Sequence, residues 1–197
     1  MSLNTNTKNY NFNLFFQEYI KIFGSIKSTK TVDNLKLIIA AAAQYKASQN
    51  QLAYIIATAY HETAHDFIPK YEFGNKEYFV RKYWLNTRVA KWLGNDDALD
   101  AFECRGRGLV QITGEDNYIK FGIRDNPDMA LEINKAIEIL FVGMLQGIFT
   151  GKKLSKYIND DICYFISARY VVNGNDRAEK IADYAKKFLF LLKSSEI

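Results

Sequence analysis

Residues 48–69 read SQNQLAYIIATAYHETAHDFIP. Ser48 and Gln51 have the spacing of a capping box, in which each side chain accepts a hydrogen bond from the backbone amide of the other, so a helix is predicted to begin here. The helix must end before Pro69, because the residue preceding a proline avoids the helical conformation. An apolar stripe with the helical period lies between these limits and consists of Leu52, Ile55, Ile56, Ala59 and Thr63.

Helical periodicity recurs on both sides of this segment, whereas the middle of the chain lacks it. Residues 66–120 are short aromatic-rich pieces punctuated by glycines, so a binding cleft is expected there, built from loops on a rigid scaffold. Further helices are expected over residues 12–23, from Thr31 or Asp33 to Tyr45, over residues 133–145 and 154–172, and after Asp176 as the N-cap of a last helix. The prediction is a mainly α fold, residues 1–197 forming one domain, with residues 1–9 as a loose tail.

Composition excludes several classes of protein. The chain has 197 residues, of which 48% are hydrophobic and 24% charged, which argues against wholesale disorder. Its longest apolar run, residues 37–43, is far shorter than the roughly 20 residues of a membrane-spanning helix. No export signal is evident at the N-terminus. The net charge of +4 would favour approach to an anionic polymer without identifying one.

The pentapeptide from His61 to His65 matches the zinc-peptidase pattern H-E-x-x-H. Two histidines at i and i+4 on one helix face could bind zinc, with Glu62 activating a bound water. Catalytic zinc usually takes three protein ligands, and these are the chain's only two histidines. The zinc-hydrolase interpretation is therefore a minor alternative, and no metal is expected.

Glu62 alone suggests a different chemistry. It lies beside the apolar stripe near the helix C-terminus, where burial and the negative helix pole should both raise the pKa of its carboxyl group. A surface glutamate paired with Lys70 is the simpler interpretation, but Glu72 follows in a loop that can fold back over the helix end. Two carboxyl groups in different surroundings are the minimum required to cleave a glycosidic bond. Spacing alone leaves three rivals for the second role: Asp66, Glu77 and Glu103.

The segment RGRGLVQITG, residues 105–114, supplies a possible polar wall. In an extended segment Val110 and Ile112 would point inward, while Gln111 and Thr113 would point to the other face. Such a row suits a polyhydroxylated or amide-bearing sugar, and its glycines do not fit a nucleotide-binding motif. The alternative is a tight structural turn with Arg105 or Arg107 paired to an internal acid. One or two aromatic residues of the preceding segment should line a groove, among Tyr71, Phe73, Tyr78, Phe79, Tyr83 and Trp84.

These motifs together resemble glycoside hydrolase family 19, and most closely its phage endolysins and prophage lysozymes, which are related to chitinases. The resemblance covers nearly the whole chain, and residues 106–118 are its most specific part. It is carried by residues 59–64, Pro69, residues 72–74, residues 78–79, residues 93–95, residues 106–118, residues 149–155 and residues 169–178. It implies a lysozyme-like, two-lobed helical fold with a small irregular or β segment beside the cleft.

The resemblance also implies roles for individual residues. Glu62 matches the general acid, Glu72 the residue that holds the attacking water, and Thr113 a residue that helps to place that water. His61 becomes a supporting residue of the substrate site, and His65 is incidental. Contacts with substrate are expected from His61, Arg107, Gln111, Asn117 and Tyr118. No cofactor is expected.

The function expected from this resemblance is that of a peptidoglycan-degrading endolysin, a muramidase that cleaves β-1,4 bonds next to N-acetylated sugars by inversion. Such a protein waits in the host cytoplasm, has no separate wall-binding module, and reaches the wall after a holin opens the membrane. Its expected partner is a glycan strand rather than nucleic acid or membrane, and it is expected to act as a monomer. A chitinase is the close alternative, and a non-catalytic wall-binding protein a distant one.

Overall fold

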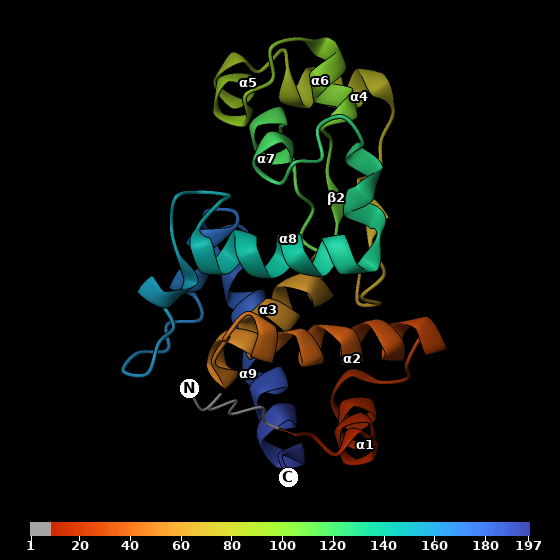
Figure 1. Cartoon of the computed structure of the whole chain (residues 1–197), viewed down its shortest axis with the longest axis vertical. Helices are drawn as coiled ribbons and strands as arrows, with labels where there is room; N and C mark the ends of the chain where they lie inside the picture. Colours follow the sequence, from red (N-terminus) through yellow and green to blue (C-terminus); the bar gives the residue numbers. More distant parts are fainter. Residues whose placement is uncertain (1–8) are drawn as a thin grey trace, which may run out of the picture.

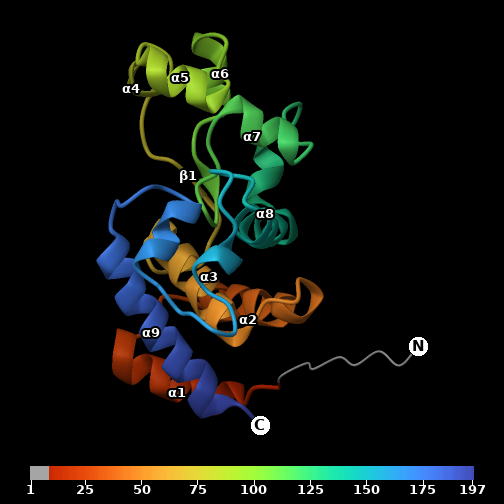
Figure 2. The same ribbon diagram turned by 90° about the vertical axis from the view of Figure 1, so that its left-hand side faces the viewer.

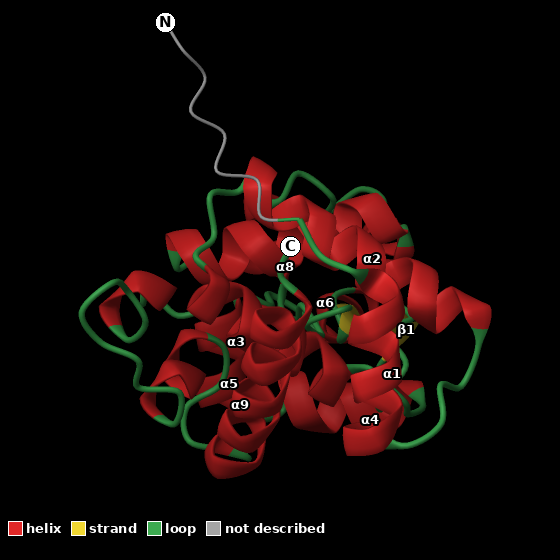
Figure 3. Cartoon of the chain, turned by 90° about the horizontal axis from the view of Figure 1, so that it is seen from below, coloured by secondary structure: helices red, strands yellow, loops and turns green. Residues whose placement is uncertain are grey.

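The computed structural model describes residues 9–197, so all but the last residue of the predicted tail, residues 1–9, lies outside the described residues. Helices dominate, accounting for 60% of the described residues, and a two-stranded sheet accompanies them, which confirms the predicted mainly α fold with a small β segment. The strands are a minor feature among the helices and loops (Figure 3).

The larger group of helices surrounds α3, which runs from Gln49 to Glu62. The predicted capping box of Ser48 and Gln51 is present at its start. Residues 51–60 are all buried, so α3 is enclosed on every side rather than along one stripe, because α2, α8 and α9 pack around it (Figure 1). We call this group the large lobe; its other helices are α1 (Phe12–Phe23), α2 (Thr29–Gln44), α8 (Ile133–Gln146) and α9 (Ala178–Ser195).

The middle of the chain forms a second group of helices, the small lobe, which stands away from the large lobe in both side views (Figures 1 and 2). Sequence periodicity predicted irregular structure here, but the segment contains four short helices, too short to display a helical period. Asn75, Asn86 and Asp97 cap three of them, as their side chains accept backbone amide hydrogens. The four helices are α4 (Lys76–Tyr83), α5 (Thr87–Leu93), α6 (Ala98–Glu103) and α7 (Glu115–Lys120). A small core of Phe79, Tyr83, Leu93 and Ala101 holds much of this lobe together.

Two short antiparallel strands lie beside the junction of the lobes. β1 (Lys70–Tyr71) pairs with β2 (Arg107–Gly108), with Lys70 opposite Gly108. The segment after β2 is a tight loop rather than an extended strand: the backbones of Arg107 and Ile112 exchange hydrogen bonds of 3.1 and 2.9 Å, and Gln111 has φ of 55°. Val110 and Ile112 are nevertheless buried as predicted, because the loop turns them toward the core.

The C-terminal part of the chain departs from the sequence prediction in two places. Residues 154–172 are not one helical region but contain two 3-10 turns, Leu154–Lys156 and Ser167–Val171. Asp176 does not cap α9, because Arg177 occupies that position in the left-handed conformation. A further 3-10 turn, Pro127–Leu131, precedes α8. Among residues 9–197, no helix combines the length and the apolar character needed to cross a membrane.

Candidate active site

A cleft of about 450 Å³ lies between the lobes. From the large lobe, the end of α3 supplies His61 and Glu62. Val172 and Asn173, which follow the 3-10 turn Ser167–Val171, also line the cleft. The small lobe contributes residues of α4, α5 and α7, and Glu72 comes from the segment after β1. The cleft therefore brings both predicted carboxyl groups to one space, although ten positions separate them in the sequence.

Glu62 is the last residue of α3, and its side chain is only 17% exposed. Burial raises the pKa of its carboxyl group, and the charge of Asp176 adds to this effect. The guanidinium of Arg169 opposes the shift, with Nη1 3.0 Å from Oε1 of Glu62, but burial outweighs it. The carboxyl group therefore keeps its proton to a higher pH than an ordinary glutamic acid does, which is the direction that a general acid requires.

Arg169 is a site residue that sequence reasoning did not predict. Its side chain is 2% exposed, and its Nε donates a 2.9 Å hydrogen bond to the carbonyl of Asp176. Its Nη1 lies 3.0 Å from Oε1 of Glu62, so the two side chains form a largely buried ion pair. The sequence signal that could have identified it is an arginine within the apolar run of residues 168–172. Such an arginine is expected to be buried, and a buried arginine normally pairs with an acid.

Glu72 occupies the small-lobe wall of the cleft in a polar setting. Its Oε1 lies 2.7 Å from Nζ of Lys82, and its Oε2 accepts hydrogen bonds from the Tyr83 hydroxyl at 2.8 Å and from the Gly106 amide at 3.1 Å. A Cβ at Gly106 would lie 2.8 Å from Oε1 of Gln111 and 2.9 Å from Oε2 of Glu72, so a larger residue here would displace these side chains. The three donors hold the Glu72 carboxylate in one orientation.

The three rival acids are placed elsewhere. Asp66 pairs with Lys70 at 2.8 Å, which also removes Lys70 as the expected surface partner of Glu62. Glu103 pairs with Arg124 at 3.0 Å, and Glu77 is exposed in the first turn of α4. Among the described residues, Glu62 and Glu72 are the carboxylates that line the cleft.

Three predicted polar residues form a tethered wall of the cleft. Gln111 donates from Nε2 to the Lys70 carbonyl at 2.9 Å, and the Thr113 hydroxyl donates to the Gln111 carbonyl at 2.9 Å. Asn117 donates from Nδ2 to the Thr113 carbonyl at 2.8 Å. Each side chain is therefore fixed in orientation through one donor, while its oxygen remains able to accept a hydrogen bond from a ligand.

Tyr118 and Arg107, both predicted to contact substrate, are buried instead. Their side chains bond to each other, Nη1 to Oη at 3.1 Å, and the Tyr118 hydroxyl donates to the Arg105 carbonyl at 2.7 Å. Arg107 also pairs with Asp128 at 2.9 Å. They hold the loop that presents Gln111 and Thr113, so the structural-turn alternative describes Arg107 better than substrate contact does.

The aromatic lining differs in part from the sequence expectation. Tyr83, one of the six candidates, lines the cleft, whereas Phe79 lies in the small-lobe core. Trp92 of α5 was not among the six candidates, but it lines the cleft and is largely exposed. An exposed indole face on a cleft wall is suited to packing against a sugar ring.

The two histidines do not share a helix face. Helix α3 ends at Glu62, and His65 lies beyond it with φ of 73°. The His65 ring stacks on Tyr60 with centroids 4.3 Å apart, and its Nε2 lies 3.2 Å from the Tyr184 hydroxyl, whereas His61 lines the cleft. The helical geometry assumed for the zinc motif is therefore wrong. Within residues 9–197 no group of three or more His, Cys, Asp or Glu side chains is arranged to hold a metal ion.

His61 should remain uncharged across the working pH range. Burial, and then the positive charge of Arg169, lower its pKa to about 4. Because the folded protein binds this proton less readily than the unfolded chain, the contribution of His61 to stability is lost as pH falls from about 6.5 toward about 4. Nuclear magnetic resonance titration of the His61 ring should show a midpoint near 4; a midpoint near the ordinary histidine value would contradict the burial of this ring.

The cleft thus combines a buried carboxyl group with a raised pKa and a second carboxylate that is held by three donors. This is the arrangement of an acid and a base acting from opposite walls. No protein-family model, curated protein or solved structure matches this chain. Its function must therefore be argued from the side chains of the cleft.

Proposed function

We propose that this chain is a glycosidase of the endolysin type, a muramidase that hydrolyses β-1,4 bonds between the N-acetylated amino sugars of peptidoglycan. The observation that carries the proposal is the contrast between Glu62 and Glu72 across one cleft. Burial raises the pKa of the Glu62 carboxyl group, while Glu72 pairs with Lys82 and accepts a hydrogen bond from the Tyr83 hydroxyl. The motifs that resemble glycoside hydrolase family 19 fit this proposal, and lysis of a bacterial host by a phage is the proposed setting.

In the proposed reaction, Glu62 donates its proton to the oxygen of the leaving sugar, and Glu72 accepts a proton from the attacking water. Thr113 would orient that water, because its hydroxyl is fixed by donation to the Gln111 carbonyl. Inversion at the anomeric carbon requires room for water, so the carboxyl groups should stand roughly 6.5–9.5 Å apart in the substrate complex. Arg169 would then stabilise Glu62 after it has lost its proton.

The rest of the cleft fits a strand of amino sugars. Gln111 and Asn117 offer amide oxygens to sugar hydroxyl and N-acetyl groups, and Trp92 offers an aromatic face. The net charge of +4 would help the protein to approach an anionic wall. A chitinase would use the same acid and base, so the products must separate these two activities.

The test is mass spectrometry of the soluble products released from purified peptidoglycan. Fragments that end in reducing N-acetylmuramic acid are expected from a muramidase. Reducing N-acetylglucosamine ends would instead identify a glucosaminidase, and no peptidoglycan product together with cleavage of chitin oligomers would identify a chitinase. Cut peptide stems on intact glycan would contradict glycosidase activity altogether.

A further inference from the structure

A second hollow adjoins the cleft on the far side of Glu72. It has a volume of about 630 Å³ and shares Glu72 with the cleft. Its walls are mainly aromatic, formed by Tyr71, Phe73 and Phe102, and Arg105 also lines it. Phe73 is 100% exposed, so its whole ring is accessible to a ligand. A ligand in this hollow would lie directly beside a strand bound in the cleft.

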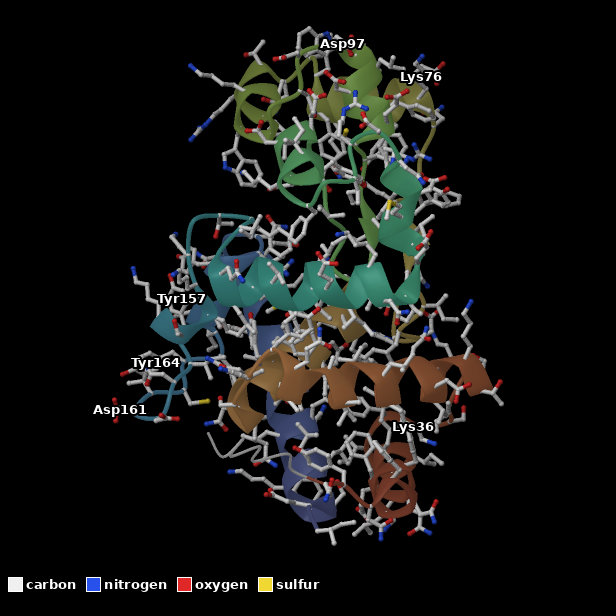
Figure 4. The ribbon with its side chains drawn as sticks, in the orientation of Figure 1. Lys36, Lys76, Asp97, Tyr157, Asp161 and Tyr164 are labelled. Carbon is white, nitrogen blue, oxygen red and sulfur yellow. The ribbon has the colours of Figure 1, made fainter. Side chains whose placement is uncertain are left out.

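The guanidinium of Arg105 is held against these rings. It lies 4.4 Å from the centroid of Phe102 and 4.9 Å from that of Tyr71, and Nη1 donates to the Phe102 carbonyl at 2.8 Å. Arginine stacked in this way is oriented yet keeps its remaining donors for a ligand. Lys76 adds a second cation at the rim, with Nζ 5.9 Å from the Phe102 ring; it projects from α4 at the edge of the small lobe (Figure 4).

The acids near this hollow are already paired. Glu72 is neutralised by Lys82 at 2.7 Å, and Asp128 by Arg107 at 2.9 Å. Among residues 9–197, no carboxylate forms an ion pair with Arg105. The hollow therefore combines apolar rings with a partly buried guanidinium that has no carboxylate of the described residues within ion-pair distance, which is the complement of an anionic ligand with small apolar groups.

We propose that this hollow binds the acidic peptide stem carried by muramic acid, and that Arg105 pairs with a carboxylate of that stem. The inference rests on the proposed glycosidase function and adds a basis for preferring peptidoglycan to chitin, which has no stems. The planar fork of Arg105 suits bidentate pairing with a carboxylate. Phe73 and Tyr71 would cover the alanine methyl groups of the stem.

The experiment compares initial rates on two substrates: purified peptidoglycan with its stems, and the same glycan after an amidase has removed them. Three variants are used: Arg105→Gln, Phe73→Ser, and Arg88→Gln, an exposed charge on α5. The ratio of the rate with stems to the rate without stems should fall about tenfold in Arg105→Gln, the size of one charge-assisted hydrogen bond. A several-fold fall is expected in Phe73→Ser, and the Arg88→Gln ratio should match the wild type.

Equal losses on both substrates would overturn the inference, because they would indicate a further sugar site or a folding defect. Phe73→Ser guards against the second cause, since a fully exposed ring contributes little to the fold. An unchanged ratio in both Arg105→Gln and Phe73→Ser would also overturn it.

Calorimetry separates this inference from the proposed function. A disaccharide tetrapeptide is titrated into the Glu62→Gln protein, alone and combined with Arg105→Gln, so that binding is measured without hydrolysis. Binding that depends on Arg105 would support the peptide-stem pocket even if the wild type cuts no glycan. Failure of the wild type to cut glycan would refute the proposed function only. Absence of tetrapeptide binding while the wild type cuts glycan would refute the pocket alone.

Discussion

Replacement of Glu62 by Gln is expected to reduce hydrolysis of peptidoglycan by at least about 10³-fold, within the range attributed to a general acid. Glutamine has the same size but no proton to give to the leaving oxygen. The measurement is the initial rate of reducing-end release from purified sacculi. Glu77→Gln is the matched control, because Glu77 is exposed in the first turn of α4 and should retain full activity.

The Glu62→Gln protein should remain folded, although somewhat less stable, because Arg169 is 2% exposed and its Nη1 lies 3.0 Å from the carboxyl group that is replaced. Circular dichroism and thermal unfolding separate this effect from the loss of the acid. A folded variant that still hydrolyses sacculi at a substantial rate would rule out Glu62 as the acid.

The pH dependence of wild-type activity provides a second test of the role of Glu62. Burial raises the pKa of Glu62, so the active protonated form persists above the ordinary glutamic acid range, and kcat/KM should fall as pH rises through that raised value. Stability should respond in the same direction. The folded state holds the proton more tightly than the unfolded chain, so the contribution of Glu62 to the free energy of unfolding declines as pH rises through this window.

The sequence predicted the large lobe well and the small lobe poorly, for a physical reason. Helix α3 begins with a capping box and contains a long apolar run, and Gly24 is the C-cap of α1, as expected. In both helices the local sequence signals and the tertiary packing favour the same structure. The helices of the small lobe have eight residues or fewer, and their caps at Asn75 and Asn86 are the main local sign of them. The loop after β2 took its form from the hydrogen bonds between Arg107 and Ile112, which hydrophobic alternation does not encode.

The candidate site shows the same division. Glu62 was identifiable from local sequence, because it lies beside the apolar stripe of its own helix. Its partner Arg169 comes from a 3-10 turn more than a hundred positions later, and that pairing depends on the packing of distant segments. Tyr118 and Arg107 illustrate the opposite error: a motif adjacent to the cleft contains residues that hold the loop from behind as well as residues that face the cleft.

Replacement of Glu72 by Ala is expected to reduce hydrolysis by about 10²–10³-fold, because the attacking water loses the group that accepts its proton. The fold should survive, since the Lys82 side chain is 44% exposed and can be solvated once its partner is removed. Asp66→Asn is the matched control, because Asp66 also forms an ion pair with a lysine, Lys70, but does not line the cleft.

Azide distinguishes a catalytic base from a residue that only shapes the wall. In Glu72→Ala the small anion can enter the vacated space and attack without needing a base, so added azide should restore turnover and yield a glycosyl azide of inverted configuration. Glu62→Gln should not respond in this way on sacculi, because its leaving oxygen still lacks a proton. A Glu72→Ala protein that loses activity but shows no azide product, while remaining folded, would mean that Glu72 orients Lys82 and Tyr83 rather than activating water. Retained activity in Glu72→Ala would return the second role to another residue of the cleft.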